Sequence, residues 1–455
     1  MILVALPVIF AVITLAFGVI YVLVDYVRIL RLRQRMAPGP LPLPLFGNIF
    51  HIPSSRQWMK FEEWSLKYQS TIITIWDGHT PVVICNDAWS MSDLGDKRAN
   101  IFSSRPVKTL TGKIFGLNKF NQAGLAYGEQ WRVHRRLTHS AANAQMIQAY
   151  RPSQANEAKL LIEDCLTKPD RFVDSALRFT VSIISIIAWG RRIGTESDTV
   201  LKVASAYVGS ANLGFLGKTY TEAIPALADI KVEISNLTGN FIGAGVDTTT
   251  STMLTFVLAM CLNQDVQSKA YEEIDRIIGR DRCPDWSDED SLPYLAAVIN
   301  ETLRWRPAFA LGGPPHAPIE DDIYNGFFFP RGTSIIGNLY ATHRNPGEAL
   351  AQQSLYFTIV SLLWAFEIRP GLDEKGNEVA LDLDAYTVSQ VNRPLPFKVR
   401  FIPRSETIAD LVRSGAEEAR TQLQAYDAVT NVTFESAQSV SLGMPIAQAD
   451  NGSAV

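Results

Sequence analysis

The sequence predicts a mainly α-helical protein with small β-sheets, preceded by a single N-terminal transmembrane helix. Three observations predict this fold class. The first 24 residues carry no charged side chain. From about residue 57 onward, apolar residues recur at helical spacing, and only a few short runs rich in β-branched residues interrupt them. With 47% hydrophobic residues against 19% charged, the 455-residue chain has enough apolar material for a large core.

Charge and cysteine content exclude several classes of protein. The chain has 42 lysines and arginines against 46 acidic residues, a net charge of -4, so it has no basic surplus for pairing with nucleic acid. Its four cysteines are scattered singly, without a C-x-x-C pair. We therefore expect neither a disulfide framework nor a cysteine zinc site, and a reducing compartment fits best.

Residues 1–24 are long enough to cross the hydrocarbon core of a bilayer as one helix. The alternative is a cleaved signal peptide, but the apolar run is longer than a signal core and no basic residue precedes it. Four arginines follow the run directly, at positions 28, 31, 33 and 35. Because basic clusters stay on the cytosolic side, we expect a membrane anchor with the body of the protein in the cytosol.

The remaining chain divides by composition. Residues 25–56 predict a basic stop followed by a proline-rich hinge, because the alternating prolines of PGPLPLPLFGN forbid a helix and favour a stiff extended path. Residues 57–404 predict the folded domain. Residues 405–455 predict one amphipathic helix and a polar, disordered tail.

Within the domain, periodicity predicts helices at 127–147, 156–166, 172–188, 240–263, 293–306 and 347–366. Strand-like runs lie at 70–76, 81–85, 326–329 and 397–402.

The segment NFIGAGVDTTTSTMLTFVLAM is helical in length but holds two glycines and a cluster of threonines around one acid. Such residues lower helix stability, so something should offset them. Gly243 and Gly245 would let a flat ligand approach the backbone, and the Thr248 hydroxyl could bond the Ala244 carbonyl and open the helix locally. With Asp247 beside it, this hydroxyl would form a proton-delivery arrangement. The alternative is a buried helix whose small residues permit tight packing.

Three other groups are candidates for binding or bracing. Glu301 and Arg304 stand three apart in NETLRWRP and share a helix face; the alternative is an ordinary solvated pair. Trp131 and Arg135 share a face in WRVHRR, where the basic groups could hold an anion or simply form a solvated face. His316 in GGPPHAP could donate a hydrogen bond to a carboxylate; the alternative is an ordinary loop histidine.

Taken in order, these pieces resemble the cytochrome P450 superfamily, and specifically its membrane-anchored fungal members. The similarity runs from the anchor and hinge through IFSSRP, WRVHRR, GAGVDTT and SLPYLAAVINETLRWRP to PFKVRFIPRS. Each motif is weak alone, but the ordered set is specific.

The resemblance implies roles for particular residues. Trp131, Arg135 and His316 match residues that contact the propionates of a haem cofactor. The oxygen-binding groove is matched by Ala244 and Gly245, with Asp247 and Thr248 as its acid and alcohol. Glu301 and Arg304 match the ion pair that braces the core on the haem side.

One expected element is missing from the chain. The family's iron-ligating loop has the pattern F-x-x-G-x-R-x-C-x-G, and no such loop exists in this sequence. ATHRNP resembles the segment well before that loop, whereas residues 348–368 resemble the helix immediately after it, so the chain passes over the loop at Pro346 and Gly347. A second shortening is expected near residues 226–240. Cys283 in GRDRCPDW is superficially similar to the ligand loop but precedes Glu301, so no metal ligand is assigned.

By resemblance, we expect a P450-like fold, incomplete at these two places, and a haem-dependent monooxygenase that is impaired in this chain. It would oxidise a lipophilic small molecule, such as a secondary metabolite, with O2 and electrons from NADPH-cytochrome P450 reductase. Its expected location is the endoplasmic reticulum membrane, single-pass, facing the cytosol, and no nucleic-acid partner is expected. The alternative is a catalytically inactive, membrane-anchored P450-like protein without thiolate-ligated haem.

Overall fold

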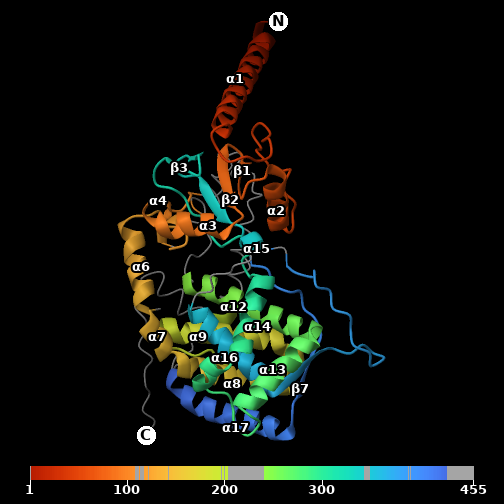
Figure 1. The fold of residues 1–455 in the computed structure, drawn as a ribbon. Helices are drawn as coiled ribbons and strands as arrows, with labels where there is room; N and C mark the ends of the chain where they lie inside the picture. The colour runs from red at the N-terminus through yellow and green to blue at the C-terminus, as the bar shows by residue number, and fades with distance from the viewer. Residues whose placement is uncertain are drawn as a thin grey trace.

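The computed structural model is a mostly helical fold with three small sheets (Figure 1). It describes residues 2–107, 112, 117–120, 122–141, 143–195, 197–198, 200–202, 240–342, 349–387, 389 and 391–427. Figure 1 shows α1 (Ile2–Arg33) projecting from one end, a sheet-containing part at its base, and a helical bundle beyond.

Helix α1 continues nine residues past the predicted end of the anchor at residue 24. Its segment Val12–Arg33 is apolar and long enough to cross a membrane, and only 6% of that window is buried. The last turns differ from this exposed part because Ile29 packs into the core of the sheet, together with Met36 and Trp76. The predicted basic stop is therefore the last part of α1. It packs against the sheet because apolar residues alternate there with the arginines.

The main sheet has the strand order β1-β2-β5, with β1 (Ile72–Asp77) antiparallel to β2 (Thr80–Cys85) and β2 parallel to β5 (Ser334–Gly337). The proline-rich segment lies along the edge of β1. There the Thr74 amide donates to the Pro38 carbonyl (3.0 Å) and the Asn48 amide donates to the Trp76 carbonyl (2.7 Å). The predicted hinge is therefore fixed to the sheet rather than free.

Two antiparallel hairpins complete the β structure. The first joins β3 (Asp322–Tyr324) to β4 (Phe327–Phe329), and the second joins β6 (Phe366–Pro370) to β7 (Val399–Pro403). The sequence predicts strands at β4 and β7 but not at β3 or β6, because β3 and β6 carry charged residues beside their apolar ones.

The helical bundle holds the largest core of the molecule. It forms where α8 (Arg151–Thr167), α9 (Phe172–Trp189), α12 (Asn240–Leu262) and α16 (Ala349–Ala365) pack together. Phe179, Phe256 and Trp364 are among its fully buried side chains. The apolar window of α12 passes the length and hydropathy test for a membrane span, but it is 83% buried, so α12 is a core helix.

One buried ionic network ties α8 to α9. The carboxylate of Glu157 is fully buried and accepts hydrogen bonds from Arg178 (2.8 Å), Ser182 (2.8 Å) and Arg192 (2.9 Å). Three donors on one carboxylate offset the cost of removing these charges from water.

The other described helices are shorter or lie further out. They are α2 (Gln57–Tyr68), α3 (Ala88–Ser92), α4 (Ala99–Phe102), α5 (Leu117–Phe120), α6 (Glu129–Ala141), α7 (Ala144–Ala149), α13 (Gln264–Ile277), α14 (Pro293–Trp305), α15 (Leu339–Thr342) and α17 (Glu406–Leu423). The predicted helix at 127–147 is two helices, because the Asn143 side chain caps a new start by accepting from the Met146 amide (3.0 Å).

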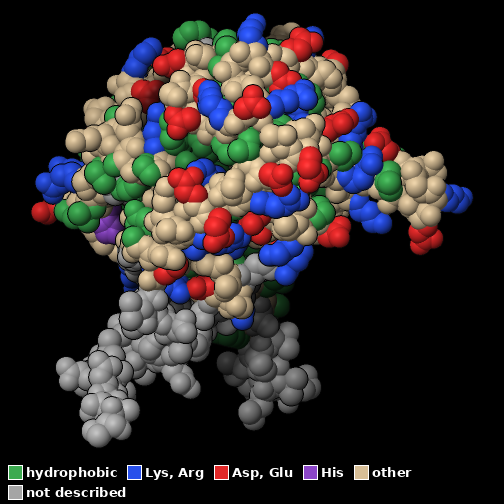
Figure 2. Space-filling view, turned by 90° about the horizontal axis from the view of Figure 1, so that it is seen from below, with side chains coloured by type: hydrophobic (Ala, Val, Ile, Leu, Met, Phe, Trp, Pro, Cys, Tyr) green, Lys and Arg blue, Asp and Glu red, His purple; other side chains and the backbone are tan. Residues whose placement is uncertain are grey.

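Helix α17 is the predicted amphipathic C-terminal helix. It begins after Ser405, whose hydroxyl accepts from the Ile408 amide, and it packs against α8. Figure 2 views the molecule from the end opposite α1 and shows acidic and basic side chains interspersed, with no continuous field of one sign. The predicted disordered tail beyond residue 427, the shortening near 226–240 and the junction of Pro346 with Gly347 lie outside the described residues, except that residue 240 begins α12.

Candidate functional site

Helix α12 carries Asp247 and Thr248, the residues matched to proton delivery. Asp247 is buried, and its carboxylate oxygen Oδ1 lies 3.7 Å from Nη1 of Arg393. This opposite charge offsets part of the cost of burying the carboxylate. Thr248 is half-buried, and its backbone carbonyl accepts from the Thr252 hydroxyl (2.9 Å). The acid and alcohol thus lie on adjacent positions of a helix that the core holds firmly.

A segment far along the chain covers the polar side of α12. The Ser251 hydroxyl donates to the Asn392 carbonyl, and the Thr255 hydroxyl lies 3.4 Å from that of Tyr386. The Asn392 amide donates to the Ala308 carbonyl just beyond α14 (2.8 Å). The segment around residues 386–393 is therefore fastened to both helices, which brings Arg393 to Asp247.

Two features of α12 bear on its hydroxyls and its glycines. The helix is unbroken from Asn240 to Leu262, so the predicted local opening does not occur; its hydroxyls, such as that of Thr250, bond carbonyls four residues back within an intact helix. A Cβ on Gly245 would lie 2.2 Å from Cδ1 of Ile184 on α9. Gly245 therefore permits close packing of two helices, whereas the surroundings of Gly243 and Ala244 are not among those that the structure describes.

A cationic cluster forms where three separate segments meet. Arg105 donates through Nη1 to the carbonyls of Pro314 (2.5 Å) and Pro315 (3.1 Å), while its buried Nε has no acceptor among the described residues. Burial, together with the positive charge of Arg135 on α6, lowers the pKa of Arg105 to about 10. Two neighbouring guanidinium groups and an unpaired N–H favour an anionic ligand group here.

His316 lies beside Arg105 but is not a cation at neutral pH. Burial, together with the positive charge of Arg105, lowers its pKa to about 4. Its Nδ1 lies 3.0 Å from the Phe102 carbonyl. Because a carbonyl only accepts, Nδ1 carries the proton and Nε2 is left as an acceptor. The expectation that His316 donates to a carboxylate therefore requires a second proton on the ring.

The other two predicted groups lie nearer solvent. Trp131 is half-buried, with its ring 5.2 Å from that of Tyr127, whereas Arg135 is exposed. Glu301 and Arg304 form a two-contact ion pair on α14, with 2.6 Å between Oε2 and Nε. Their side chains are 59% and 44% exposed, so among the residues that the structure describes this pair lies at the surface. Arg304 holds the pKa of Glu301 below its usual value.

All four cysteines of the chain lie within the described residues, and all are free. Cys85, Cys165 and Cys261 are buried. Burial raises the pKa of the Cys85 and Cys261 thiols to about 12 and raises that of Cys165 well above its usual value. Cys261 lies almost four turns along α12 from Asp247. These three thiols are protonated and enclosed by packing.

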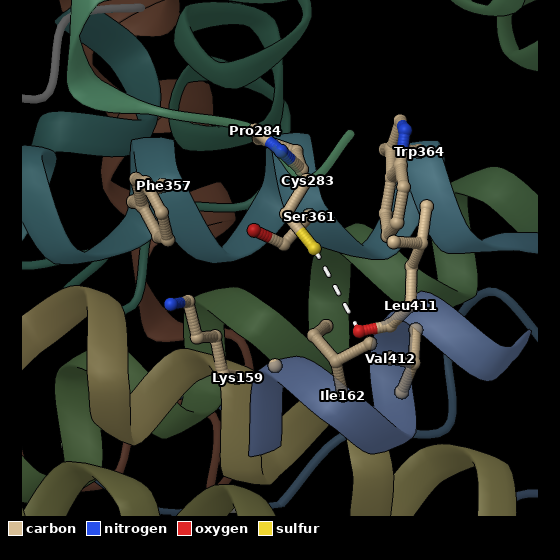
Figure 3. Close-up of a pocket in the computed structure, with 10 residues that line it drawn as sticks. Lys159, Ile162, Cys283, Pro284, Phe357, Ser361, Trp364, Leu411 and Val412 are labelled. Atoms are coloured by element: carbon tan, nitrogen blue, oxygen red, sulfur yellow. Dashed lines mark hydrogen bonds between the residues drawn. The ribbon is translucent and has the colours of Figure 1, made fainter. Parts of the chain in front are cut away.

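Cys283 is half-buried in a small pocket between α8, α16 and α17 (Figure 3). Its Sγ lies 3.8 Å from the Leu411 carbonyl, and Lys159, Ser361 and Trp364 also line the pocket. The cavity has room for about one water molecule. Burial raises the pKa of Cys283, so this thiol is also protonated at neutral pH.

Comparison with known proteins decides the family. The cytochrome P450 family matches residues 37–217 and 230–370, well over half of the chain. The chain belongs to the cytochrome P450 family.

Curated P450 relatives come from fungi and are named monooxygenases. One from Armillaria gallica is 28% identical over 473 aligned positions, which cover 82% of this chain and 91% of the relative. P450 monooxygenase 58 of Postia placenta is 27% identical (83% and 90% covered), and peniB of Penicillium patulum is 28% identical (85% and 87%). The first alignment is longer than the 455-residue chain yet covers only 82% of it, so part of that relative has no counterpart here.

Membership in the P450 family implies a haem cofactor. The described residues fit the carboxylate groups of a haem but not its iron. Arg105 and Arg135 have the charge and the unpaired N–H that carboxylate groups of a porphyrin would take. The iron of a P450 haem needs a cysteine thiolate, but three of the four cysteines are buried in packed cores and Cys283 lines a pocket with room for about one water molecule. The chain therefore does not fit a thiolate-ligated haem.

Two residues at this site escaped the sequence analysis. Arg105 belongs to the motif IFSSRP, whose arginine could have been singled out as a second cation beside Arg135. Arg393 gave no local signal, because only the folded path of its segment brings it to Asp247.

Proposed function

We propose that this polypeptide is a membrane-anchored P450 of the haem monooxygenase type whose catalysis is impaired in this chain. The single observation that carries the proposal is the packing around the four thiols. A P450 depends on a thiolate ligand to activate oxygen, but Cys85, Cys165 and Cys261 are buried by neighbouring side chains, and the pocket at Cys283 has room for about one water molecule. The groove acid Asp247 on α12 and the anion-binding cluster of Arg105 and Arg135 are retained, without the thiolate ligand that would make them productive.

The substrate class and redox partner follow from the family. The relatives are named monooxygenases, and P450 enzymes of this type act on lipophilic small molecules with O2. We therefore propose that the substrate of this reaction is a secondary metabolite or a similar lipophilic molecule, and that NADPH-cytochrome P450 reductase is the electron donor. The retained residues that would serve that reaction are Asp247 and Thr248 for protons and Arg105 and Arg135 for the haem carboxylates.

The proposed location is the endoplasmic reticulum membrane, with the domain facing the cytosol. Helix α1 supports it, because an exposed apolar helix ends in a cluster of arginines. Alkaline carbonate extraction and protease treatment of sealed microsomes test this proposal. The protein should stay in the membrane pellet, and its domain should be digested from outside; release by carbonate or protection from protease would contradict it.

A second candidate is a catalytically inactive P450-like protein that never carries thiolate-ligated haem. The observation that favours it is the alignment in which part of the relative has no counterpart in this chain. If that part is missing from every product of the gene, inactivity is the normal state of the protein. If a longer product exists, this chain is a shortened form of an active enzyme.

Sequencing full-length transcripts across the codons for Pro346 and Gly347 separates these two functions. A longer transcript that encodes F-x-x-G-x-R-x-C-x-G at this point would establish an active parent. Transcripts that all join Pro346 directly to Gly347 would establish the inactive form. A purified protein of this sequence with stoichiometric haem and a thiolate-type reduced carbonyl spectrum would overturn the proposal of impaired catalysis.

A further inference from the structure

Cys283 lies where the C-terminal helix covers the segment between α13 and α14. Its Sγ lies 3.8 Å from the Leu411 carbonyl oxygen on α17. A Cβ on Gly415, one turn further along that helix, would lie 3.6 Å from Sγ. Because Gly415 has no side chain, α17 closes over the sulfur but leaves the small cavity beside it that Figure 3 shows.

One buried hydroxyl at this cavity is unpaired. Ser361 on α16 is only 6% exposed, and Figure 3 shows its side chain pointing into the cavity beside Cys283. Its hydroxyl has no hydrogen-bond partner among the residues that the structure describes. Thr358 on the same helix differs, because its hydroxyl donates to the Ser354 carbonyl (2.8 Å). An unpaired buried hydroxyl costs free energy, so Ser361 is available to a polar atom in the cavity.

A cation lies on another side of the cavity. Lys159 comes from α8, and its ammonium group lies 3.4 Å from a carboxylate oxygen of Glu418 on α17. Burial raises the pKa of Cys283, the charge of Lys159 lowers it, and that of Glu418 raises it. The ammonium group therefore favours the anionic forms of the sulfur, both the thiolate and an oxidised anion.

We propose that Cys283 is a site of oxidation by hydrogen peroxide and that the cavity receives the oxygen atom of the resulting sulfenic acid. The thiolate sulfur attacks one peroxide oxygen, so an S–O bond forms as the O–O bond breaks. Sulfur loses two electrons to the peroxide, and the leaving hydroxide takes up the proton that the thiol released. One thiol and one hydrogen peroxide thus give one sulfenic acid and one water.

The size of the cavity determines where this oxidation stops. The cavity has room for about one water molecule, and therefore for one oxygen atom on Sγ, within reach of the Ser361 hydroxyl. Sulfinic acid needs a second oxygen on the same sulfur. Because the first oxygen fills the cavity, it blocks the approach of a second peroxide. Cys283 should therefore remain a sulfenic acid under conditions that oxidise an exposed cysteine further.

Peptide mass spectrometry of the full chain in detergent micelles tests the proposal. After hydrogen peroxide treatment, catalase removes the peroxide, and unfolding in urea with dimedone traps sulfenic acid. The matched control is Ser414→Cys in a Cys283→Ser background, which places an exposed thiol on α17 next to Gly415. Ser361→Ala removes the unpaired hydroxyl. The three buried native cysteines should stay unoxidised in every variant, which checks that each protein is folded.

At a peroxide dose that converts most of the cysteine at position 414 to sulfinic acid, the wild type should carry the dimedone adduct at Cys283, with about tenfold less sulfinic acid there. Ser361→Ala should raise the sulfinic fraction at Cys283, because the cavity is wider and the sulfenic oxygen has lost its partner. Cys283 that stays a thiol at this dose, or that reaches sulfinic acid as readily as position 414, would overturn the proposal. An unchanged sulfinic fraction in Ser361→Ala would overturn the role of Ser361.

Discussion

Replacing His316 by asparagine should remove a specific acid sensitivity from the protein. The imidazole is buried beside Arg105, and its pKa is lowered from 6.5 to about 4. In the variant, the asparagine amide nitrogen takes the place of Nδ1 and still donates to the Phe102 carbonyl. The variant therefore keeps the hydrogen bond and loses only the titration.

The sign and size of the effect follow from the two pKa values. Because the pKa falls on folding, the unfolded chain binds the proton more readily, so this stabilisation is complete above pH 6.5 and is lost as the pH falls toward 4. Each unit of pKa difference corresponds to about 1.4 kcal/mol. Relative to His316→Asn, the wild-type free energy of unfolding should fall by about 2 kcal/mol between pH 7 and pH 5.

Urea unfolding of both full chains in detergent micelles, followed by tryptophan fluorescence, measures this difference. Other acidic groups titrate equally in the two proteins, so the comparison isolates His316. Parallel pH dependences would refute the reasoning, because they would mean that the pKa of His316 is the same in the folded and the unfolded protein, as for a solvated imidazole.

Three further predictions concern packing, charge and thiols. Glu157→Gln should lower the free energy of unfolding, measured in urea, by about 3–5 kcal/mol because it leaves buried arginines without their carboxylate. Glu301→Gln should lower it by less than about 1 kcal/mol because that ion pair is exposed. Equal losses in the two variants would contradict both burial assignments. Iodoacetamide should modify only Cys283 in the folded protein and all four cysteines in urea, by mass spectrometry; a second reactive thiol in the folded state would contradict the burial. Gly47→Ala should lower stability by about 2 kcal/mol through its positive φ of 59° and its contact with Trp76, while Gly95→Ala, in open space, should not.

The sequence predicts the helices of the bundle because their signals are local. The predicted helix at 172–188 agrees with α9 to within one residue at its end, since an apolar run is closed there by Gly190 in a left-handed cap. The end of α1 is different. Arg28, Arg31 and Arg33 are typical of the end of a membrane span, but Ile29 continues the helix because the sheet, built from distant residues, gives it a buried surface.

In the candidate site too, local spacing in the sequence predicts some properties, and long-range packing determines the others. Helical spacing places Asp247 and Thr248 side by side and pairs Glu301 with Arg304. It could not predict that the latter pair is exposed, since exposure depends on what else packs against α14. It could not predict the charge state of His316 either, because Phe102 and Arg105 lie more than 200 positions away along the chain. Long-range packing determines both properties.

The reduced carbonyl spectrum of the purified full chain, reconstituted with haemin, tests the central claim most directly. Four single Cys→Ser variants, at positions 85, 165, 261 and 283, serve as the comparison. The account predicts that the wild type shows no thiolate-type spectrum and that no variant changes the wild-type spectrum. A thiolate-type spectrum that disappears in one of the four variants would contradict the account and identify that cysteine as the iron ligand.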